Sequence, residues 1–260
     1  MKTSLLVLFT TGLFLILTAG SCLQGKHVTG SKNYLTKKVE VGQFNEVKLS
    51  SSANVTYHQG SQNYIEIYGS DNIIPLLETY VDGNTLIIKY KKNVTIWKGK
   101  LEVKVFSPEL NKLTINGSGD IRLANGIQTK EDISLSINGS GDIKGEKFKC
   151  RRMTVSINGS GDVKLQQIES KECIASIAGS GDIGLSGKTL HAEYKIAGSG
   201  NIGADNLKSE NVSASTAGSG SISCHVTGKL KVRVAGSGDI AYRGNPQEID
   251  APRKNIRQIK

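Results

Sequence analysis

The heptapeptide at residues 115–121 reads Ile-Asn-Gly-Ser-Gly-Asp-Ile, and its Gly-Ser-Gly centre occurs seven times along the chain. The copies begin 22, 20, 20, 19, 20 and 18 residues apart. A period near 20 residues is typical of a solenoid, in which each repeat buries its apolar side by stacking on its neighbours. The sequence therefore predicts an all-β, single-stranded parallel β-helix, expected to be right-handed because right-handed crossovers dominate.

The two glycines of each copy are predicted to serve the turn of a coil. When coils stack about 4.8 Å apart, the turns form a column in which any Cβ would meet the same atom of the next coil. A Gly on either side of one Ser also lets the backbone adopt positive φ. The predicted structural turn residues are Gly117, Gly119, Gly139, Gly141, Gly159, Gly161, Gly179, Gly181, Gly198, Gly200, Gly218, Gly220, Gly236 and Gly238.

The residues that flank these turns should align in columns as well. Asn116, Asn138 and Asn158 precede the first three turns, and we expect them to form an amide ladder. A row of acidic residues follows the first four turns, namely Asp120, Asp142, Asp162 and Asp182. Each carboxylate could accept hydrogen bonds from the amides of its own turn, or neighbours could share Ca²⁺, which takes oxygen ligands. No other metal or cofactor is expected.

The N-terminus has the pattern of an export signal. Lys2 is followed by an apolar run over 5–17, which is too short to span a bilayer comfortably, and by small residues at 19–21. Residues 1–21 are therefore predicted to be a signal peptide. Cys22 comes directly after the small residues, as in a bacterial lipobox, and is the predicted lipidation site. The alternative is ordinary signal cleavage, which leaves Cys22 as a free thiol.

The rest of the chain reads as one domain behind a tether. Residues 22–33 are polar and Gly-rich, and we expect a flexible tether there. The solenoid domain is placed at 34–250, with degenerate coils over 34–112 and clear repeats over 113–242, and residues 243–260 are interpreted as a C-terminal cap and tail. One short helix is expected through Pro75, capped by Asp71 or Asn72.

Composition excludes several function classes. The net charge of +10 is spread along the chain, and an exported protein meets anionic lipid and acidic glycans, so no nucleic-acid partner is expected. The four histidines are scattered, and no nucleophile elbow or phosphate-binding loop is present. Cys150, Cys173 and Cys224 are expected to be small buried residues, although a bridge between Cys150 and Cys173 stays open if both point the same way.

The repeats also resemble a known family. The seven Gly-Ser-Gly copies, the stretch Val-Asp-Gly-Asn-Thr-Leu-Ile-Ile at 81–88 and Tyr-Arg-Gly-Asn-Pro at 242–246 are similar to the auto-transporter adhesin head, or GIN, domain. The resemblance covers residues 34 to about 250. It implies a β-helix of pectin-lyase-like architecture without the catalytic residues, and a part in adhesion inferred from the fold.

The expected function is accordingly that of a non-catalytic protein of the bacterial cell envelope. We expect an adhesin-like β-helix that presents a surface to a glycan or a surface protein and that meets the membrane through its lipid anchor only. The expected location is the outer membrane, on either its periplasmic or its surface side. Two alternatives stay open: a carbohydrate-active enzyme similar to a polysaccharide lyase that uses the acidic row, and a purely structural periplasmic scaffold.

Overall fold

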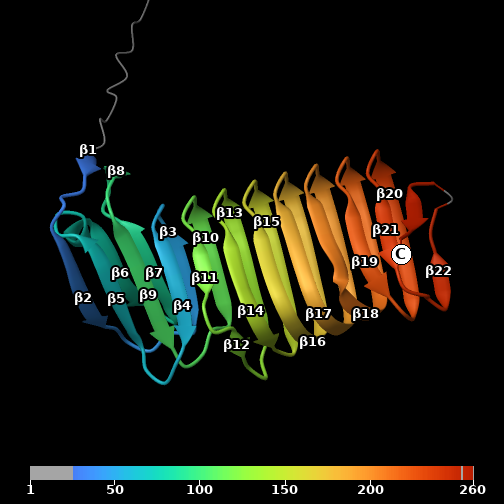
Figure 1. Ribbon diagram of the computed structural model, residues 1–260, viewed down its shortest axis with the longest axis horizontal. Helices are drawn as coiled ribbons and strands as arrows, with labels where there is room; N and C mark the ends of the chain where they lie inside the picture. The colour runs from blue at the N-terminus through green and yellow to red at the C-terminus, as the bar shows by residue number, and fades with distance from the viewer. Residues whose placement is uncertain (1–25, 253, 260) are drawn as a thin grey trace, which may run out of the picture.

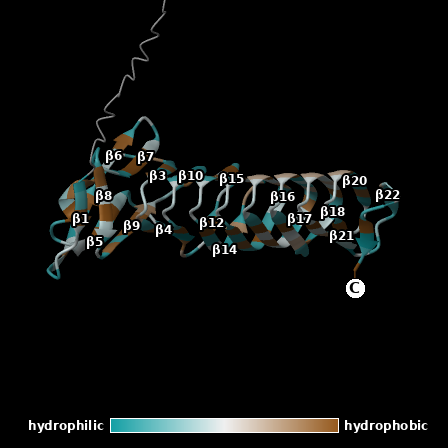
Figure 2. Ribbon diagram, turned by 90° about the horizontal axis from the view of Figure 1, so that it is seen from above, coloured by the Kyte–Doolittle hydropathy of each residue, from teal (hydrophilic) through white to brown (hydrophobic). Residues whose placement is uncertain are grey.

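The computed structural model describes residues 26–252 and 254–259, and over these residues the chain forms a rod of stacked β-coils (Figure 1). Each regular coil has one strand that runs to the Gly-Ser-Gly turn and a second strand that leads away from it. Equivalent strands of successive coils pair in parallel. The predicted all-β solenoid is confirmed, with about seven turns. The strands make two faces, which Figure 2 shows as two layers.

Face A contains the strands that run toward the turns, together with one antiparallel strand at its N-terminal end. In spatial order from the N-terminal end they are β6 (Leu77–Asp82), β7 (Thr85–Tyr90), β3 (Glu46–Ser50), β10 (Lys112–Gly117), β13 (Ile133–Gly139), β15 (Arg152–Gly159), the second halves of β16 (Val163–Gly179), β17 (Asp182–Gly198) and β18 (Asn201–Gly218), then β20 (Lys229–Gly236) and β22 (Glu248–Asp250).

Face B contains the strands that lead away from the turns, together with one antiparallel strand near its N-terminal end. Its order is β2 (Tyr34–Glu40), β5 (Tyr64–Ser70), β9 (Leu101–Ser107), β4 (Asn54–Gln59), β11 (Ile121–Leu123), β14 (Ile143–Lys149), the first halves of β16, β17 and β18, then β19 (Ile222–Val226), β21 (Ile240–Arg243) and β23 (Ile256–Gln258). The short strand β12 (Ile127–Gln128) pairs with the end of β14.

The first glycine of a turn is required both by its backbone torsion and by stacking, and the second by stacking alone. Gly139 has φ of +143°, a conformation that L side chains rarely adopt. Gly141 has no such torsion, but a Cβ on it would lie 2.0 Å from the carbonyl oxygen of Gly119 in the preceding coil. The equivalent contact is 2.0 to 2.3 Å at Gly161, Gly181, Gly200, Gly220 and Gly238. At the second position, stacking alone therefore requires glycine.

The core runs along the axis of the rod between the two faces. Because side chains alternate in a strand, each coil sends every second residue inward. In-register pairing stacks Ile115, Ile137, Ile157 and Ile177 into one buried column. Tyr194 fits the same interior because its partners in the adjacent coils are the small residues Ala175 and Ala214. Alternating large and small residues in this way lets stacked layers interdigitate.

The order of coils along the rod differs from their order in the chain. The coil formed by β3 and β4 lies between β7 and β9 on one side and β10 and β11 on the other. In Figure 1 this blue coil separates the green β9 from the green β10. Its turn is the degenerate copy of the repeat, since Leu49 pairs with Ile115 and Val55 with Ile121.

The remaining N-terminal strands correct the expectation of degenerate coils over 34–112. β2 and β5, β5 and β9, and β6 and β7 pair antiparallel, so the outer strands β2 and β6 end the two faces as hairpin-like caps and not as further coils. The β6–β7 hairpin stands out from the rod in Figure 2. At the other end, β22 and β23 pair in parallel with β20 and β21, so the predicted cap contributes one more partial coil.

Two local expectations need correction. Residues 26–33 were expected in a flexible tether, but Lys26–Thr29 form strand β1, which pairs in parallel with β8 (Val94–Lys98). The expected helix is the single 3₁₀ turn η1 (Ile74–Leu76), whose N-cap is Ile73 without a side-chain cap. The Asn72 oxygen Oδ1, which would have to accept from the helix as a cap, instead accepts from the Ser31 N–H at 2.8 Å, because the segment after β1 supplies a competing donor. None of the described residues forms a helix long and apolar enough to cross a bilayer.

A matched pair of glycine substitutions tests the stacking argument. Gly161→Ala places a methyl group 2.0 Å from the Gly141 carbonyl oxygen, and we expect it to destabilise the fold by about 3 kcal/mol or more. Gly184→Ala is the control, because its Cβ would meet nothing closer than 3.9 Å. We expect the control to be neutral or stabilising by about 0.5 kcal/mol, since glycine weakens a strand. Urea unfolding followed by circular dichroism measures both, and equal stability of the two variants would contradict the argument.

Candidate functional site

The sequence predicts candidate site residues in the asparagine and aspartate columns that flank the turns. The structure aligns both columns as expected. Asn138 Nδ2 donates to Asn116 Oδ1 at 2.9 Å, and Asn158 Nδ2 donates to Asn138 Oδ1 at 3.0 Å. The amide ladder is thus present, on face A beside the turns. Its three side chains are directed at one another along the rod, which fixes their orientation but uses part of their hydrogen-bonding capacity.

The acidic row is also present, but its hydrogen bonds differ from the predicted ones. The backbone N–H of Asp142 donates to Oδ1 of Asp120 at 2.9 Å, and the same contact joins Asp162 to Asp142 and Asp182 to Asp162 at 3.1 and 3.0 Å. Each carboxylate therefore binds the next coil and not its own turn. The physical reason is that stacking brings the next coil's amide within reach of the side chain, as in a ladder.

Neither metal binding nor a disulfide is visible in the arrangement of the predicted residues. Within the described part of the chain, no group of three or more His, Cys, Asp or Glu side chains is placed to hold a metal ion. Cys150, Cys173 and Cys224 are free and buried, as the small-residue interpretation predicted, and burial raises the pKa of each thiol to about 12. The predicted lipidation site Cys22 and the predicted signal peptide lie outside the described residues.

A row of outward residues on face B changes from basic side chains to glycine and serine halfway along the rod. In register it reads Arg122, Lys144, Lys164, Gly184, Gly203 and Ser223. Unlike the turn glycines, Gly184 and Gly203 have neither positive φ nor a close neighbour, since an added Cβ would lie 3.9 Å or more from any atom outside its chain neighbours. Nothing in the fold therefore requires glycine at these two positions. Glycine inside a strand often marks close approach of a ligand or another backbone.

The missing side chains leave a depression of about 320 Å³, here called the glycine notch. Asp162 and Asp182 line it toward the turns, and Lys144 and Lys164 stand at its N-terminal side. The opposite border has the polar side chains of Gln166, Ser186 and Asn206. None of the described residues that line the notch is aromatic. Its floor is bare backbone, and its rim consists of hydrogen-bonding and charged groups.

Several groups at the rim are available to a ligand. Asp162 and Asp182 use Oδ1 in the ladder, and neither Oδ2 has a hydrogen bond to any described residue. Lys144 Nζ is 2.9 Å from Asp142 Oδ2, and this contact raises the pKa of the lysine. Lys164 has no ion pair within the described ranges and is exposed. The notch thus offers free carboxylate oxygens and one unpaired ammonium group a short distance apart.

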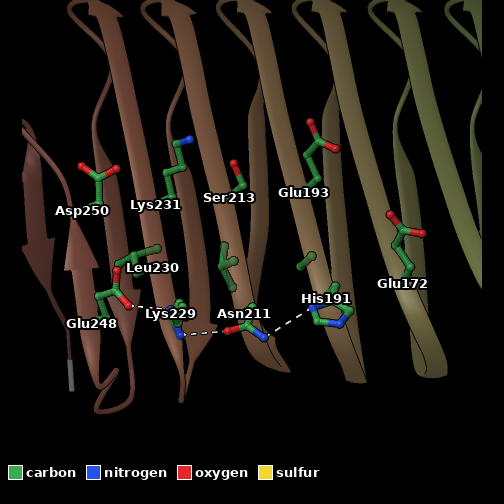
Figure 3. Close-up of a pocket in the computed structure, with 12 residues that line it drawn as sticks. Glu172, His191, Glu193, Asn211, Ser213, Lys229, Leu230, Lys231, Glu248 and Asp250 are labelled. Carbon is green, nitrogen blue, oxygen red and sulfur yellow. Dashed lines mark hydrogen bonds and ion pairs between the residues drawn. The ribbon is translucent and has the colours of Figure 1, made fainter.

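A second depression, of about 400 Å³, lies on face A near the C-terminal end (Figure 3). Its four carboxylates all form ion pairs, one with Lys229 of the lining and three with basic residues outside it. Lys229 Nζ is 2.8 Å from Glu248 Oε2, and the Lys229 backbone N–H donates to Asn211 Oδ1 at 3.1 Å. The Asn211 amide also contacts His191 Nδ1 at 3.4 Å, and Figure 3 shows these groups as one row across the coils. This row connects neighbouring coils, and the carboxylates of this depression are neutralised by basic partners, unlike those of Asp162 and Asp182 in the glycine notch.

The sequence analysis missed the glycine notch. Gly184 and Gly203 were visible as the third residue after the last glycine of their turns, where earlier repeats have Lys144 and Lys164. Aligning the repeats and asking which glycines have no turn to serve would have found them. Gly184 and Gly203 are not turn glycines, so the Gly-Ser-Gly pattern alone does not point to them.

Comparisons with known proteins support an assignment to a family. A family model described as "Putative auto-transporter adhesin, head GIN domain" matches residues 43–166 and 133–246. No match is found among curated proteins. Among solved structures, one named a putative lipid binding protein from Parabacteroides distasonis is 26% identical, with a TM-score of 0.82 over 90% of this chain and 100% of that chain.

Two further structures are named putative adhesins. One, from Bacteroides fragilis, is 28% identical, with a TM-score of 0.71 over 89% of this chain and 100% of that chain. The other, from Parabacteroides merdae, is 24% identical, with a TM-score of 0.79 over 90% and 99% of the two chains, and this likeness concerns the fold alone. The stacked coils, the in-register turns and the residues matched by the family model all support the same family assignment. The chain belongs to the auto-transporter adhesin head (GIN) domain family.

Proposed function

We propose that this protein is a non-catalytic, adhesin-like protein of the bacterial cell envelope that binds a glycan in the glycine notch of face B. The observation that carries the proposal is the pair Gly184 and Gly203, which leave a polar-rimmed depression although the fold does not require them. Keeping glycine there costs about 0.5 to 1 kcal/mol per position relative to alanine, so a function that needs the space is the simplest account.

The rim can bind the hydroxyl groups of a glycan and, at Lys164, a sugar carboxylate. Carboxylate and amide oxygens accept hydrogen bonds from sugar hydroxyls, and the side chains of Gln166 and Asn206 can also donate. The unpaired ammonium group of Lys164 is placed to bind a sugar carboxylate at the edge of the notch. Without an aromatic ring to stack on, a sugar would be held by hydrogen bonds and charge, so binding should weaken as salt is added.

The proposed location follows the expected leader. We infer that the mature chain begins at a lipidated Cys22, which anchors the protein in the outer membrane. Family membership supports a place in the cell envelope or at its surface. In this arrangement the lipid holds one end of the rod while the coils extend the two faces away from it.

Binding experiments with notch-filling variants test the proposed function. Gly184→Leu and Gly203→Leu each fill the depression without a backbone clash, and Ser213→Leu on face A is the matched control. Calorimetry against polygalacturonate, alginate and neutral dextran should show binding to an acidic polymer that both notch variants weaken at least about tenfold, a loss of about 1.4 kcal/mol. The control should bind like the unmodified protein, and all variants should keep its melting temperature.

Other results would contradict the proposal in distinguishable ways. Release of unsaturated sugar ends would favour the enzyme similar to a polysaccharide lyase. Binding that neither notch variant weakens would move the site elsewhere. Absence of binding to any glycan would favour a protein partner or a purely structural scaffold.

Counting reactive thiols tests the proposed anchor. Because burial raises the pKa of Cys150, Cys173 and Cys224 to about 12, their thiolate fraction at pH 8 is about one in ten thousand. The native mature protein should therefore give no rapid reaction with Ellman's reagent, and the unfolded protein should give three thiols. One rapidly reacting thiol in the native protein would indicate that Cys22 is present without its lipid.

A further inference from the structure

The N-terminal strand β1 is tied firmly to the rod and not loosely attached to it. β1 and β8 form a two-stranded sheet separate from both faces. The Gly30 N–H donates to the Lys98 carbonyl at 2.6 Å, and the Ser31 N–H donates to Asn72 Oδ1 at 2.8 Å. Figure 1 shows β1 and β8 side by side at the N-terminal end of the molecule. Whatever precedes residue 26 therefore enters the fold at this sheet.

The sheet presents the one tryptophan of the chain to solvent. Trp97 is 77% exposed, the largest value among the exposed large hydrophobic residues of the described chain. The register between β1 and β8 shifts at this point, so that Thr29 pairs with Lys98 and Trp97 has no partner. A bulge of this kind re-aims a side chain. The only ring contact of Trp97 in the described part of the chain is an edge-on contact with His27, with ring centroids 6.3 Å apart.

The two segments that form and flank this sheet are rich in positive charge. Residues 26–33 and 91–100 contain six lysines and no Asp or Glu. Among these lysines only Lys100 forms an ion pair with a described residue, namely Glu102 at 3.5 Å. The nearby Asp71 carboxylate is engaged by Asn33 at 2.8 Å and by Ser31. An exposed tryptophan beside unpaired lysines is the combination found at membrane–water interfaces, where the ring lies at headgroup level and lysines attract anionic lipid.

The short length of chain between Cys22 and β1 indicates that the partner of this sheet is a membrane surface. Four residue steps separate Cys22 from Lys26, and fully extended chain spans at most about 3.6 Å per residue, or roughly 14 Å in all. A lipid on Cys22 therefore keeps the bilayer surface within that distance of β1. We propose that the β1–β8 sheet is a membrane-contact surface, with Trp97 in the headgroup region and the surrounding lysines on anionic lipid. This proposal rests on the lipid anchor inferred above.

The single tryptophan makes the contact directly measurable. The mature protein, purified with its lipid, is reconstituted into vesicles of phosphatidylethanolamine and phosphatidylglycerol, with phosphatidylcholine vesicles as the uncharged comparison. Trp97 emission should shift to shorter wavelength, and lipids brominated near the headgroup should quench it at least about twofold. Lys26→Gln combined with Lys98→Gln should reduce the quenching in the anionic vesicles and have less effect in the uncharged ones.

A matched reporter controls for nonspecific quenching. Trp97→Phe combined with Tyr242→Trp moves the only tryptophan to β21, near the opposite end of the rod. Its emission should not respond to the brominated lipid. Mass spectrometry of the N-terminal peptide reports the anchor separately. Acyl chains on Cys22 together with unquenched Trp97 would overturn this proposal alone, whereas an N-terminus without acyl chains would overturn it together with the anchor. Glycan binding in the notch is independent of both results.

Discussion

The close approach of backbone to backbone in the turn column is the constraint on which the structure depends. The N–H of Ser140 donates to the Gly117 carbonyl at 2.9 Å, and the same bond joins Ser160 to Gly139 and Ser180 to Gly159. These contacts hold successive turns in register, and register aligns every other column: the core isoleucines, the asparagine ladder and the aspartate row. A one-residue slip would send the isoleucines outward, because side chains alternate in a strand. The glycines are thus a condition for the fold and do not by themselves indicate a function.

Much of this could be predicted from the sequence, because the repeat encodes stacking in one dimension. The period, the amide ladder of Asn116, Asn138 and Asn158 and the burial of the three cysteines all follow from placing equivalent residues above one another. The N-terminal third could not be predicted in the same way. There β3 and β4 pair with strands that follow them by more than 30 residues, and β5 pairs antiparallel with β9. Such long-range pairing leaves no local periodicity in the sequence.

The candidate site was harder to predict than the fold for a related reason. The aspartate row was identified, but its hydrogen bonds go to the amide of the next coil, which a reading of one turn does not include. The notch depends on side chains that are absent at Gly184 and Gly203, and absence becomes informative only when the space around a Cβ is known. In one repeat, a Cβ added to Gly181 would meet its nearest atom at 2.0 Å, whereas a Cβ added to Gly184 would meet its nearest atom at 3.9 Å.

The rod geometry also explains how an anchored end and a binding notch can belong to one molecule. The face B strands from β9 through β4, β11, β14 and β16 to β17 are joined by five successive pairings. At about 4.8 Å per step, Gly184 lies about 24 Å along the rod from β9, whereas β1 and β8 are at the N-terminal end. The solenoid has no hinge between these points, because each coil is hydrogen-bonded to the next along its strands. A lipid-bound N-terminal sheet would therefore hold the notch at a fixed distance from the bilayer, which a flexible tether of the same length could not do.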